Sequence, residues 1–195
     1  MRKNNMEKVQ KFLGMTDDNF TVKSIARISL LVAIAIILKA YLSLETGIWR
    51  LTFYDIPLMV LGVFFGPIFA IIGGLATDFV YVISRGWLYG FNIFTISAIM
   101  WALIPAIMLY RKKYTMTRLI ITVLITSSVV FTLNTIGLVQ FFGNSQLVFL
   151  EGWIPGPLLP RLVTYLIKLP VQVYLVHVLI SRLGVAFEDL QLVKK

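Results

Sequence analysis

The chain alternates between long apolar stretches and short polar segments. The apolar stretches cover Ile25–Ser43, Asp55–Phe64, Pro67–Ser84, Asn92–Tyr110, Thr117–Phe141 and Pro160–Ser181. A helix needs about 20 residues to cross a hydrocarbon core about 30 Å thick, and most of these stretches approach that length. The pattern predicts an all-α fold, that of a polytopic membrane protein with six transmembrane helices.

The second stretch, Asp55–Phe64, is too short to cross a bilayer unaided. Gly66-Pro67 separates it from the third stretch, so we expect a short helix that leads directly into the next one. The polar backbone groups at helix ends cannot face lipid. We therefore expect protein or a cavity to cover the ends of this helix.

Composition supports the membrane class. The chain is 58% hydrophobic and 14% charged, with a mean hydropathy of +0.87, whereas a soluble domain carries about 25% charged residues. The absence of cysteine excludes disulfide bonds, thiolate metal sites and cysteine nucleophiles. The polar N-terminal segment shows no signal-peptide pattern. We expect a cytoplasmic segment at 1–24, a membrane domain at 25–183 and a cytoplasmic tail at 184–195.

Lysine and arginine gather on one side of this topology. If six spans are crossed, 13 of the 18 cations lie on the side of the two termini. They are Arg2, Lys3, Lys8, Lys11, Lys23, Arg27, Arg111, Lys112, Lys113, Arg118, Arg182, Lys194 and Lys195. The positive-inside rule makes this side cytoplasmic, with both termini inside. The net charge of +9 is therefore mainly a topology signal, and we expect no nucleic-acid partner.

The remaining cations lie within the spans or near their outer ends: Lys39, Arg50, Arg85, Arg161 and Lys168. An ionisable side chain inside a bilayer costs about 2.5–3.5 kcal/mol, so it usually faces protein or a polar cavity. Arg161 and Lys168 are about two helical turns apart and share a helix face. Arg161 lies at the outer end, as Arg50 and Arg85 do, whereas Lys168 lies deeper.

Two carboxylates also lie in the apolar stretches. We expect Asp78 to pair with an internal cation, for which Lys168 is a candidate. Asp55 opens the short second helix, and we expect it to cap the free N–H groups of the first turn, with ligand contact as the alternative. Gly73 and Gly74, just before Asp78, would let helices approach closely.

The outer loops are rich in aromatic residues, namely Trp49, Trp87, Tyr89, Phe91 and Trp153. Two interpretations are open: an interfacial belt, or a lid whose rings stack on a planar ligand in an outward-facing pocket. Asn92 and Asn134 add neutral hydrogen-bonding groups. These serve either a ligand or contacts between helices.

Motifs for catalysis are absent from the sequence. His177 is the only histidine, so we expect no metal site. Neither a Gly-x-Ser-x-Gly elbow nor a GxxxxGK[ST] loop occurs. We expect that the protein binds no cofactor and is not an enzyme. A small intramembrane enzyme with Asp78 and Arg161 as its polar centre, and an autonomous secondary transporter, are the alternatives from other classes.

A series of short motifs runs along the chain from about Ile25 to Leu183. They are Arg50-Leu51-Thr52-Phe53 before Ile56-Pro57, Gly62-Val63-Phe64-Phe65-Gly66-Pro67, Gly73-Gly74-Leu75-Ala76-Thr77-Asp78, Phe94-Thr95-Ile96-Ser97-Ala98, Leu133-Asn134-Thr135, Leu159-Pro160-Arg161-Leu162 and Leu169-Pro170-Val171-Gln172. In this order and spacing they resemble the S components of energy-coupling factor (ECF) vitamin transporters, especially the folate-type group. Lys168 is an additional cation at a place where that group is usually apolar.

The resemblance implies a multi-pass protein of the bacterial cell membrane that captures one vitamin from outside. It also implies association with a module of one transmembrane scaffold subunit and two ATPase subunits. The family docks on the scaffold through small residues of the first helix, which Ala26, Ser29 and Ala33 match here. Packing within the chain is the alternative role for these residues.

The family binds its vitamin through the outer loops and the outer halves of helices four to six. The matching positions here are Arg50, Arg85, Trp87, Tyr89, Asn92, Asn134 and Arg161. Arginine suits carboxylates because its planar fork makes paired hydrogen bonds. Folate, which has carboxylates and a planar ring, is the favoured substrate. Pantothenate and a pyridine or pyrimidine vitamin are the alternatives.

Overall fold

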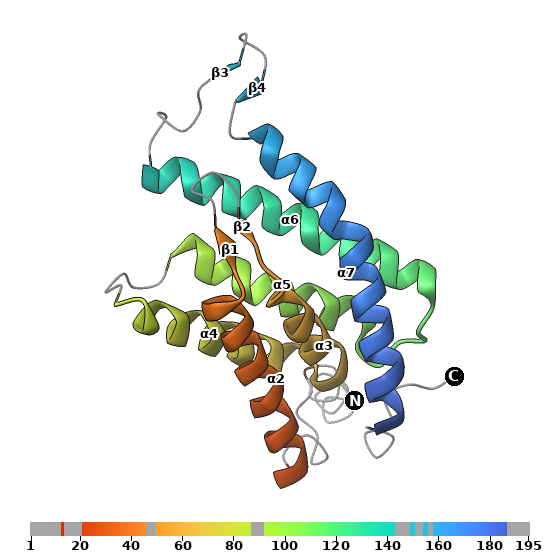
Figure 1. Cartoon of the computed structure of the whole chain (residues 1–195). Helices are drawn as coiled ribbons and strands as arrows, with labels where there is room; N and C mark the ends of the chain where they lie inside the picture. Colours follow the sequence, from red (N-terminus) through yellow and green to blue (C-terminus); the bar gives the residue numbers. More distant parts are fainter. Residues whose placement is uncertain are drawn as a thin grey trace, which may run out of the picture.

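The computed structural model describes residues 13, 21–45, 50–86, 92–142, 149–150, 154–155 and 158–186. In this part the chain forms a bundle of helices labelled α2 to α7 and two small β-hairpins (Figure 1). The helices are α2 Val22–Tyr41, α3 Asp55–Phe65, α4 Pro67–Ser84, α5 Ile93–Leu109, α6 Met116–Phe142 and α7 Leu158–Ala186. The predicted helical membrane fold is confirmed.

The two hairpins are short additions that the hydrophobic pattern did not predict. Strand β1 (Leu44–Glu45) pairs with β2 (Arg50–Leu51) between α2 and α3. Strand β3 (Phe149–Leu150) pairs with β4 (Ile154–Pro155) between α6 and α7. Both lie where α2 and α6 end and where α3 and α7 begin (Figure 1). We call this side of the bundle the hairpin end.

The helix bounds agree closely with the predicted stretches. Helix α4 has the predicted bounds, and α3 ends one residue later than predicted, at Phe65. Helix α2 begins three residues earlier, at Val22, because Thr21 caps it. The Thr21 hydroxyl accepts a hydrogen bond from the backbone N–H of Ser24 at 3.3 Å.

Helix α3 lies at the centre of the bundle. All 11 of its residues are buried, and α2, α4, α5 and α7 pack around it. At 1.5 Å per residue it is about 16 Å long, roughly half of what a bilayer crossing needs. The helices packed around it shield its backbone ends from lipid. The expectation that protein covers this helix is confirmed.

Glycines on α3 and α4 let both helices approach α5 closely. A Cβ atom on Gly62 would lie 2.0 Å from the carbonyl oxygen of Ala102 on α5, so the two backbones touch there. A Cβ atom on Gly74 of α4 would lie 2.6 Å from the Cα of Ile99, which is also on α5. Gly66 has a φ of 89°, which suits glycine and lets the chain pass directly from α3 into α4.

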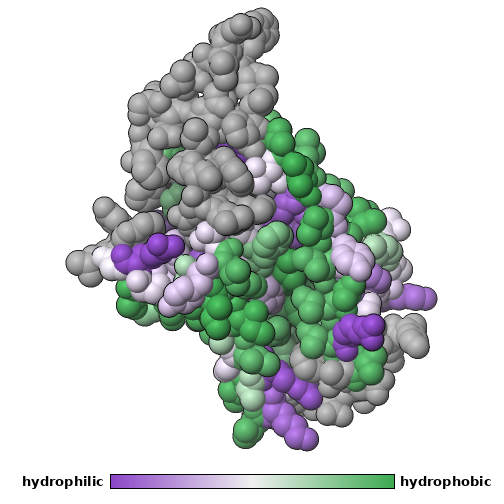
Figure 2. All heavy atoms as spheres, viewed as in Figure 1, coloured by the Kyte–Doolittle hydropathy of each residue, from purple (hydrophilic) through white to green (hydrophobic). Residues whose placement is uncertain are grey.

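The outer surface of the bundle is apolar. Among the described residues, α2, α4, Met116–Leu138 of α6 and Arg161–Val185 of α7 are long and apolar enough to cross a membrane, while α3 and α5 are shorter apolar helices. Large apolar side chains are exposed on α2, α4, α5, α6 and α7, and Figure 2 shows apolar surface over much of the visible face. Lipid accommodates such a surface and water does not.

Replacing Gly62 with alanine should destabilise the bundle, because the new methyl group would overlap the α5 backbone, which cannot move aside like a side chain. Overpacking costs roughly 1–3 kcal/mol, and we expect a loss at the upper end. Thermal unfolding of the purified protein in detergent would measure it.

Gly86→Ala is the control for this substitution. A Cβ atom at Gly86 meets nothing within 4 Å, so only its positive φ of 68° is unfavourable. That strain costs about 1 kcal/mol. If Gly62→Ala unfolds at the same temperature as the Gly86→Ala control, the bundle does not need a glycine where α3 approaches α5.

Candidate functional site

A buried ion pair joins α2 to α4. Lys39, in the last turn of α2, donates to Oδ1 of Asp78, and the two side chains are only 4% and 5% exposed. The ammonium also lies 4.9 Å from the ring centres of both Tyr54 and Tyr81, a distance at which a cation is attracted to an aromatic face. The prediction that Asp78 pairs with an internal cation is confirmed. Lys168, the candidate partner that the sequence offered, does not pair with Asp78.

The second oxygen of Asp78 connects this pair to the start of α5. Thr95 donates its hydroxyl to Asp78 Oδ2 at 2.5 Å. Asn92 is the N-cap of the helix: its Oδ1 accepts from the backbone N–H groups of Phe94 and Thr95 at 2.9 and 3.2 Å. The backbone N–H of Asn92 donates in return to the Thr95 hydroxyl at 3.4 Å, which completes a capping box. The Asn92 side-chain oxygen therefore positions the helix, and a ligand contact by Asn92 stays a prediction.

A second buried ion pair joins α3 to α7. The Lys168 ammonium donates to Oδ1 of Asp55 at 2.7 Å, and the Asp55 side chain is fully buried. Gln172, one turn further along α7, donates its amide to Asp55 Oδ2. Ser127 of α6 donates to Oε1 of Gln172 at 3.1 Å. This chain of contacts fastens α7 to both α3 and α6.

The expectation that Asp55 caps α3 is wrong. The N-cap position belongs to Tyr54, and no side chain caps this helix. Both oxygens of Asp55 are bonded to α7 instead. A carboxylate taken out of water needs a cation more than it needs backbone N–H groups, and Lys168 supplies one. The position of Asp55 in the first turn is still favourable, because the helix dipole attracts negative charge there.

Arg161 lies on α7 near the hairpin end. It is half-buried, and its guanidinium carbon lies 5.7 Å from the ring centre of Phe131 on α6. Phe131 packs on Tyr165 with ring centres 5.4 Å apart, and the Tyr165 hydroxyl is 3.0 Å from that of Ser128. Within the described ranges no carboxylate pairs with Arg161. The described part of the chain therefore leaves this charge unneutralised.

Arg85 and Asn134 lie on other helices that end on this side. Arg85 is the exposed C-cap of α4, where it donates to the carbonyl oxygen of Ala40 at 3.4 Å. Its guanidinium carbon lies 5.6 Å from the ring centre of Tyr81. Asn134 is half-buried on α6, and in the described part of the chain its side chain makes no hydrogen bond. Both keep polar groups available near the hairpin end.

The side chains of the other predicted ligand-binding residues lie outside the described part of the structure. Arg50 belongs to β2, where its backbone is the register partner of Glu45, and its side chain lies outside the described part. Trp87 and Tyr89 lie outside the described residues altogether. The aromatic lid therefore stays a prediction.

The small residues of the first helix face outward. Ala26, Ser29 and Ala33 are exposed. The buried face of α2 consists of other residues, namely Ser24, Ile28, Leu31, Ala35 and Lys39. Packing within the described part of the chain therefore does not account for the three small residues.

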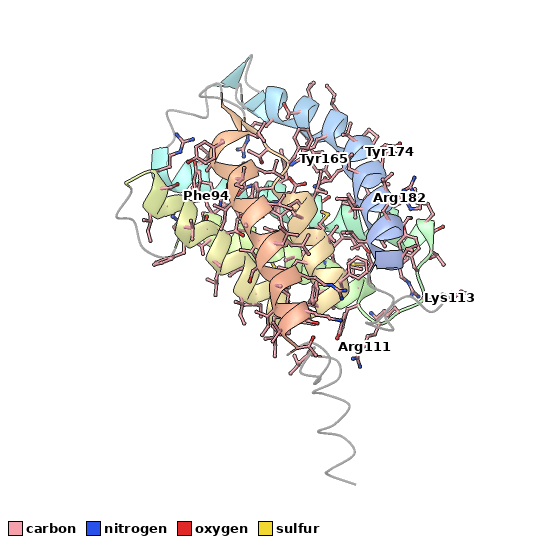
Figure 3. The ribbon with its side chains drawn as sticks, turned by 60° about the horizontal axis from the view of Figure 1, so that its bottom comes forward. Phe94, Arg111, Lys113, Tyr165, Tyr174 and Arg182 are labelled. Carbon is pink, nitrogen blue, oxygen red and sulfur yellow. The ribbon has the colours of Figure 1, made fainter. Side chains whose placement is uncertain are left out.

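The opposite end of the bundle carries the basic residues and the histidine. Figure 3 shows Arg111, Lys113 and Arg182 on the same side of the molecule. The Tyr114 hydroxyl lies 2.6 Å from His177 Nδ1. Burial raises the pKa of Tyr114, which keeps its phenol protonated and able to donate to His177. Over the described residues no group of three metal-binding side chains occurs.

Sequence reasoning found the charged groups but missed which of them meet. Lys39 and Asp78 are 39 positions apart on different helices, and nothing in the local pattern connects them. Gln172 carried a weak signal, because it lies four residues after Lys168 and so shares its helix face. The ring centre of Trp101 lies 5.3 Å from the Lys168 ammonium. In the sequence this residue is one of many apolar helix positions, and nothing marks it as a neighbour of a cation.

These contacts give the two buried carboxylates a structural role. All four oxygens of Asp55 and Asp78 accept hydrogen bonds from side chains of other helices. Asp78 pairs with Lys39, while Arg161 contacts Phe131, so the two groups suggested for an intramembrane enzyme belong to different clusters. Among the described residues the guanidinium of Arg161 has no carboxylate partner, and it stays the candidate contact for an anionic ligand.

The fold and these buried ion pairs define a polytopic helical membrane protein. A family model described as the substrate-specific component of ECF transporters matches residues 23–180. The chain belongs to this family, as its motifs predicted.

Two similar proteins extend the comparison. The folate transporter FolT of Clostridium novyi (strain NT) is 30% identical over 148 residues, which are 75% of this chain and 81% of the relative. A crystal structure of FolT bound with folic acid has the same fold, with a TM-score of 0.71 and 27% identity. That match covers 83% of this chain and 95% of the other.

Replacing Lys39 with methionine should destabilise the protein strongly, because Asp78 would stay buried without its cation. Breaking a buried pair in this way costs roughly 3–5 kcal/mol. Thermal unfolding in detergent would measure the loss. The double variant Lys39→Met/Asp78→Asn removes both charges and keeps an acceptor for Thr95, so it should recover much of the stability.

Lys112→Met is the control, because this exposed lysine lies at the opposite end of the bundle. It should unfold like the wild type. A Lys39→Met protein as stable as the Lys112→Met control would mean that the pair does not stabilise the bundle.

Proposed function

We propose that this chain is the folate-capture subunit of an ECF-type importer in a bacterial cell membrane. It binds folate from outside and then docks on a transmembrane scaffold subunit that carries two ATPase subunits, which drive release inside. In this proposal the chain itself catalyses no reaction. Residues 25–183 form the membrane domain, and the segments 1–24 and 184–195 are cytoplasmic.

The observation that carries the proposal is the guanidinium of Arg161, which has no carboxylate partner among the described residues. Both carboxylates buried in the described bundle have their own lysine, so Arg161 is available to an external anion. Its planar fork suits a carboxylate, which folate provides. The similarity to a folate transporter and to a structure bound with folic acid supports the same substrate.

The orientation follows from the distribution of basic residues. Arg111, Lys112, Lys113 and Arg118 lie between α5 and α6, and Arg182 lies near the end of α7. The positive-inside rule favours the cytoplasm for this end of the bundle. The hairpin end, where Arg161 lies, then faces outward, as capture from outside requires.

Substitution of Arg161 by alanine should weaken folate binding by more than tenfold, because a carboxylate would lose its partner in a partly desolvated place. Tenfold corresponds to about 1.4 kcal/mol. Titration of the purified protein, followed by calorimetry or tryptophan fluorescence, would measure the dissociation constant. Arg182→Ala at the opposite end is the matched control and should bind folate like the wild type.

The same titration tests the identity of the substrate. Folate, pantothenate and pyridine or pyrimidine vitamins should be compared on the wild-type protein, and folate should bind most tightly. Wild-type protein that binds none of them contradicts the capture function. Unchanged folate affinity in folded Arg161→Ala contradicts the role of the arginine.

Replacing Ala33 with tryptophan should prevent assembly with the scaffold and ATPase subunits, because a large ring would keep a partner helix away from the exposed small residues of α2. Co-purification from a membrane that contains all four subunits would measure assembly. Val80→Trp, at an exposed position of α4, is the matched control. Folate affinity of the isolated subunit should be unchanged in both variants. An Ala33→Trp subunit that assembles as the control does would rule out this docking face.

A further inference from the structure

A polar stripe runs along one face of the half of α7 nearer the hairpin end. It consists of Arg161, Tyr165, Lys168 and Gln172, which are spaced four, three and four residues apart. This spacing places them on one side of the helix. Each contacts another helix, as described above, so the stripe faces the interior of the bundle. One turn beyond Gln172 the buried position is Val176, so the stripe ends at the ion pair with Asp55.

Charge differs between the two ends of this stripe. Lys168 is balanced by Asp55 at 2.7 Å, so the inner end is neutral overall. Arg161 has no carboxylate partner within the described residues, so the other end is positive. Seven residues of helix separate the two cations, about 10 Å along the axis.

Lys168 keeps hydrogen-bonding capacity beyond its ion pair. An ammonium has three N–H donors, and in the described part of the chain Asp55 is the acceptor that Lys168 reaches. Its side chain is 14% exposed although it points at α3, whereas Asp55 is fully buried. The ring centres of Trp101 and Phe53 lie 5.3 and 5.8 Å from the ammonium. A donor beside two aromatic rings suits the polar edge of a planar heterocycle.

We propose that Lys168, held in place by Asp55, is a specificity-determining residue that donates a hydrogen bond to a neutral heteroaromatic ring of the substrate. Arg161 takes a carboxylate of the same molecule at the other end of the stripe. A second carboxylate does not suit Lys168, because it would approach the negative charge of Asp55. The substrate class is therefore an elongated molecule with a polar planar ring at one end and a carboxylate at the other.

This inference rests on the proposed function and deepens it. Folate has this form: its pteridine ring carries a carbonyl oxygen and ring nitrogens that accept hydrogen bonds, and its glutamate carries the carboxylates. The pteridine ring would lie inward at Lys168, with the glutamate towards the hairpin end.

The experiment compares folate with p-aminobenzoylglutamate, which keeps the glutamate and lacks the pteridine ring. Lys168→Met should weaken folate binding at least tenfold and change p-aminobenzoylglutamate binding less than about twofold. Arg161→Ala should weaken both ligands. The Lys112→Met control should change neither dissociation constant.

A second variant separates ligand contact from loss of structure. Lys168→Met leaves Asp55 buried without its cation, whereas Lys168→Met/Asp55→Asn removes both charges and keeps an acceptor for Gln172. The double variant should show the same selective loss of folate binding. Equal loss of both ligands, or wild-type folate affinity in either folded variant, would overturn the proposal and make the pair a purely structural link between α3 and α7. Wild-type protein that does not bind folate would instead contradict the proposed function itself.

Discussion

The neutralisation of two carboxylates in an apolar bundle is the constraint on which the other features depend. Asp55 and Asp78 lie in helices shielded from water, and each has a lysine from a distant part of the chain. One pair links α2, α4 and α5, and the other links α3, α6 and α7. Every helix of the described bundle therefore contributes to one of two polar clusters, and separating a helix from its cluster would leave a charge buried without its partner.

The pairing of Asp55 and Asp78, the two carboxylates buried in the described part of the chain, has a direct consequence for recognition. A protein that neutralises its buried carboxylates within its own fold can expose the remaining cations to a ligand without competition. Arg161 has no carboxylate partner among the described residues, and it lies on the same face of α7 as Lys168. On the proposed function, α7 therefore carries both the charge that binds a ligand and the charge that holds this helix to α3.

Much of this was predictable from the sequence, and the limits have physical reasons. Apolar runs gave the helices to within a few residues, because lipid requires long uninterrupted hydrophobic segments. The pattern also indicated that Asp78 needs a cation, but helical periodicity gives only the face of a helix and not the helix opposite it. For this reason the sequence offers Lys168 only as a candidate partner of Asp78, and it does not show that Asp55 faces α7 and not the first turn of its own helix. A hydropathy pattern does not predict hairpins with strands of two residues. It also does not distinguish Trp101, which lies beside a cation, from other apolar positions.

Helix α2 combines two roles on opposite faces. Its exposed face carries Ala26 and Ala33, and its buried face ends in Lys39, which reaches α5 through Asp78 and Thr95. A helix of 20 residues is about 30 Å long and behaves as a stiff rod. On the proposed function, a single helix therefore connects the surface on which a partner docks to the first turn of α5, through Lys39, Asp78 and Thr95.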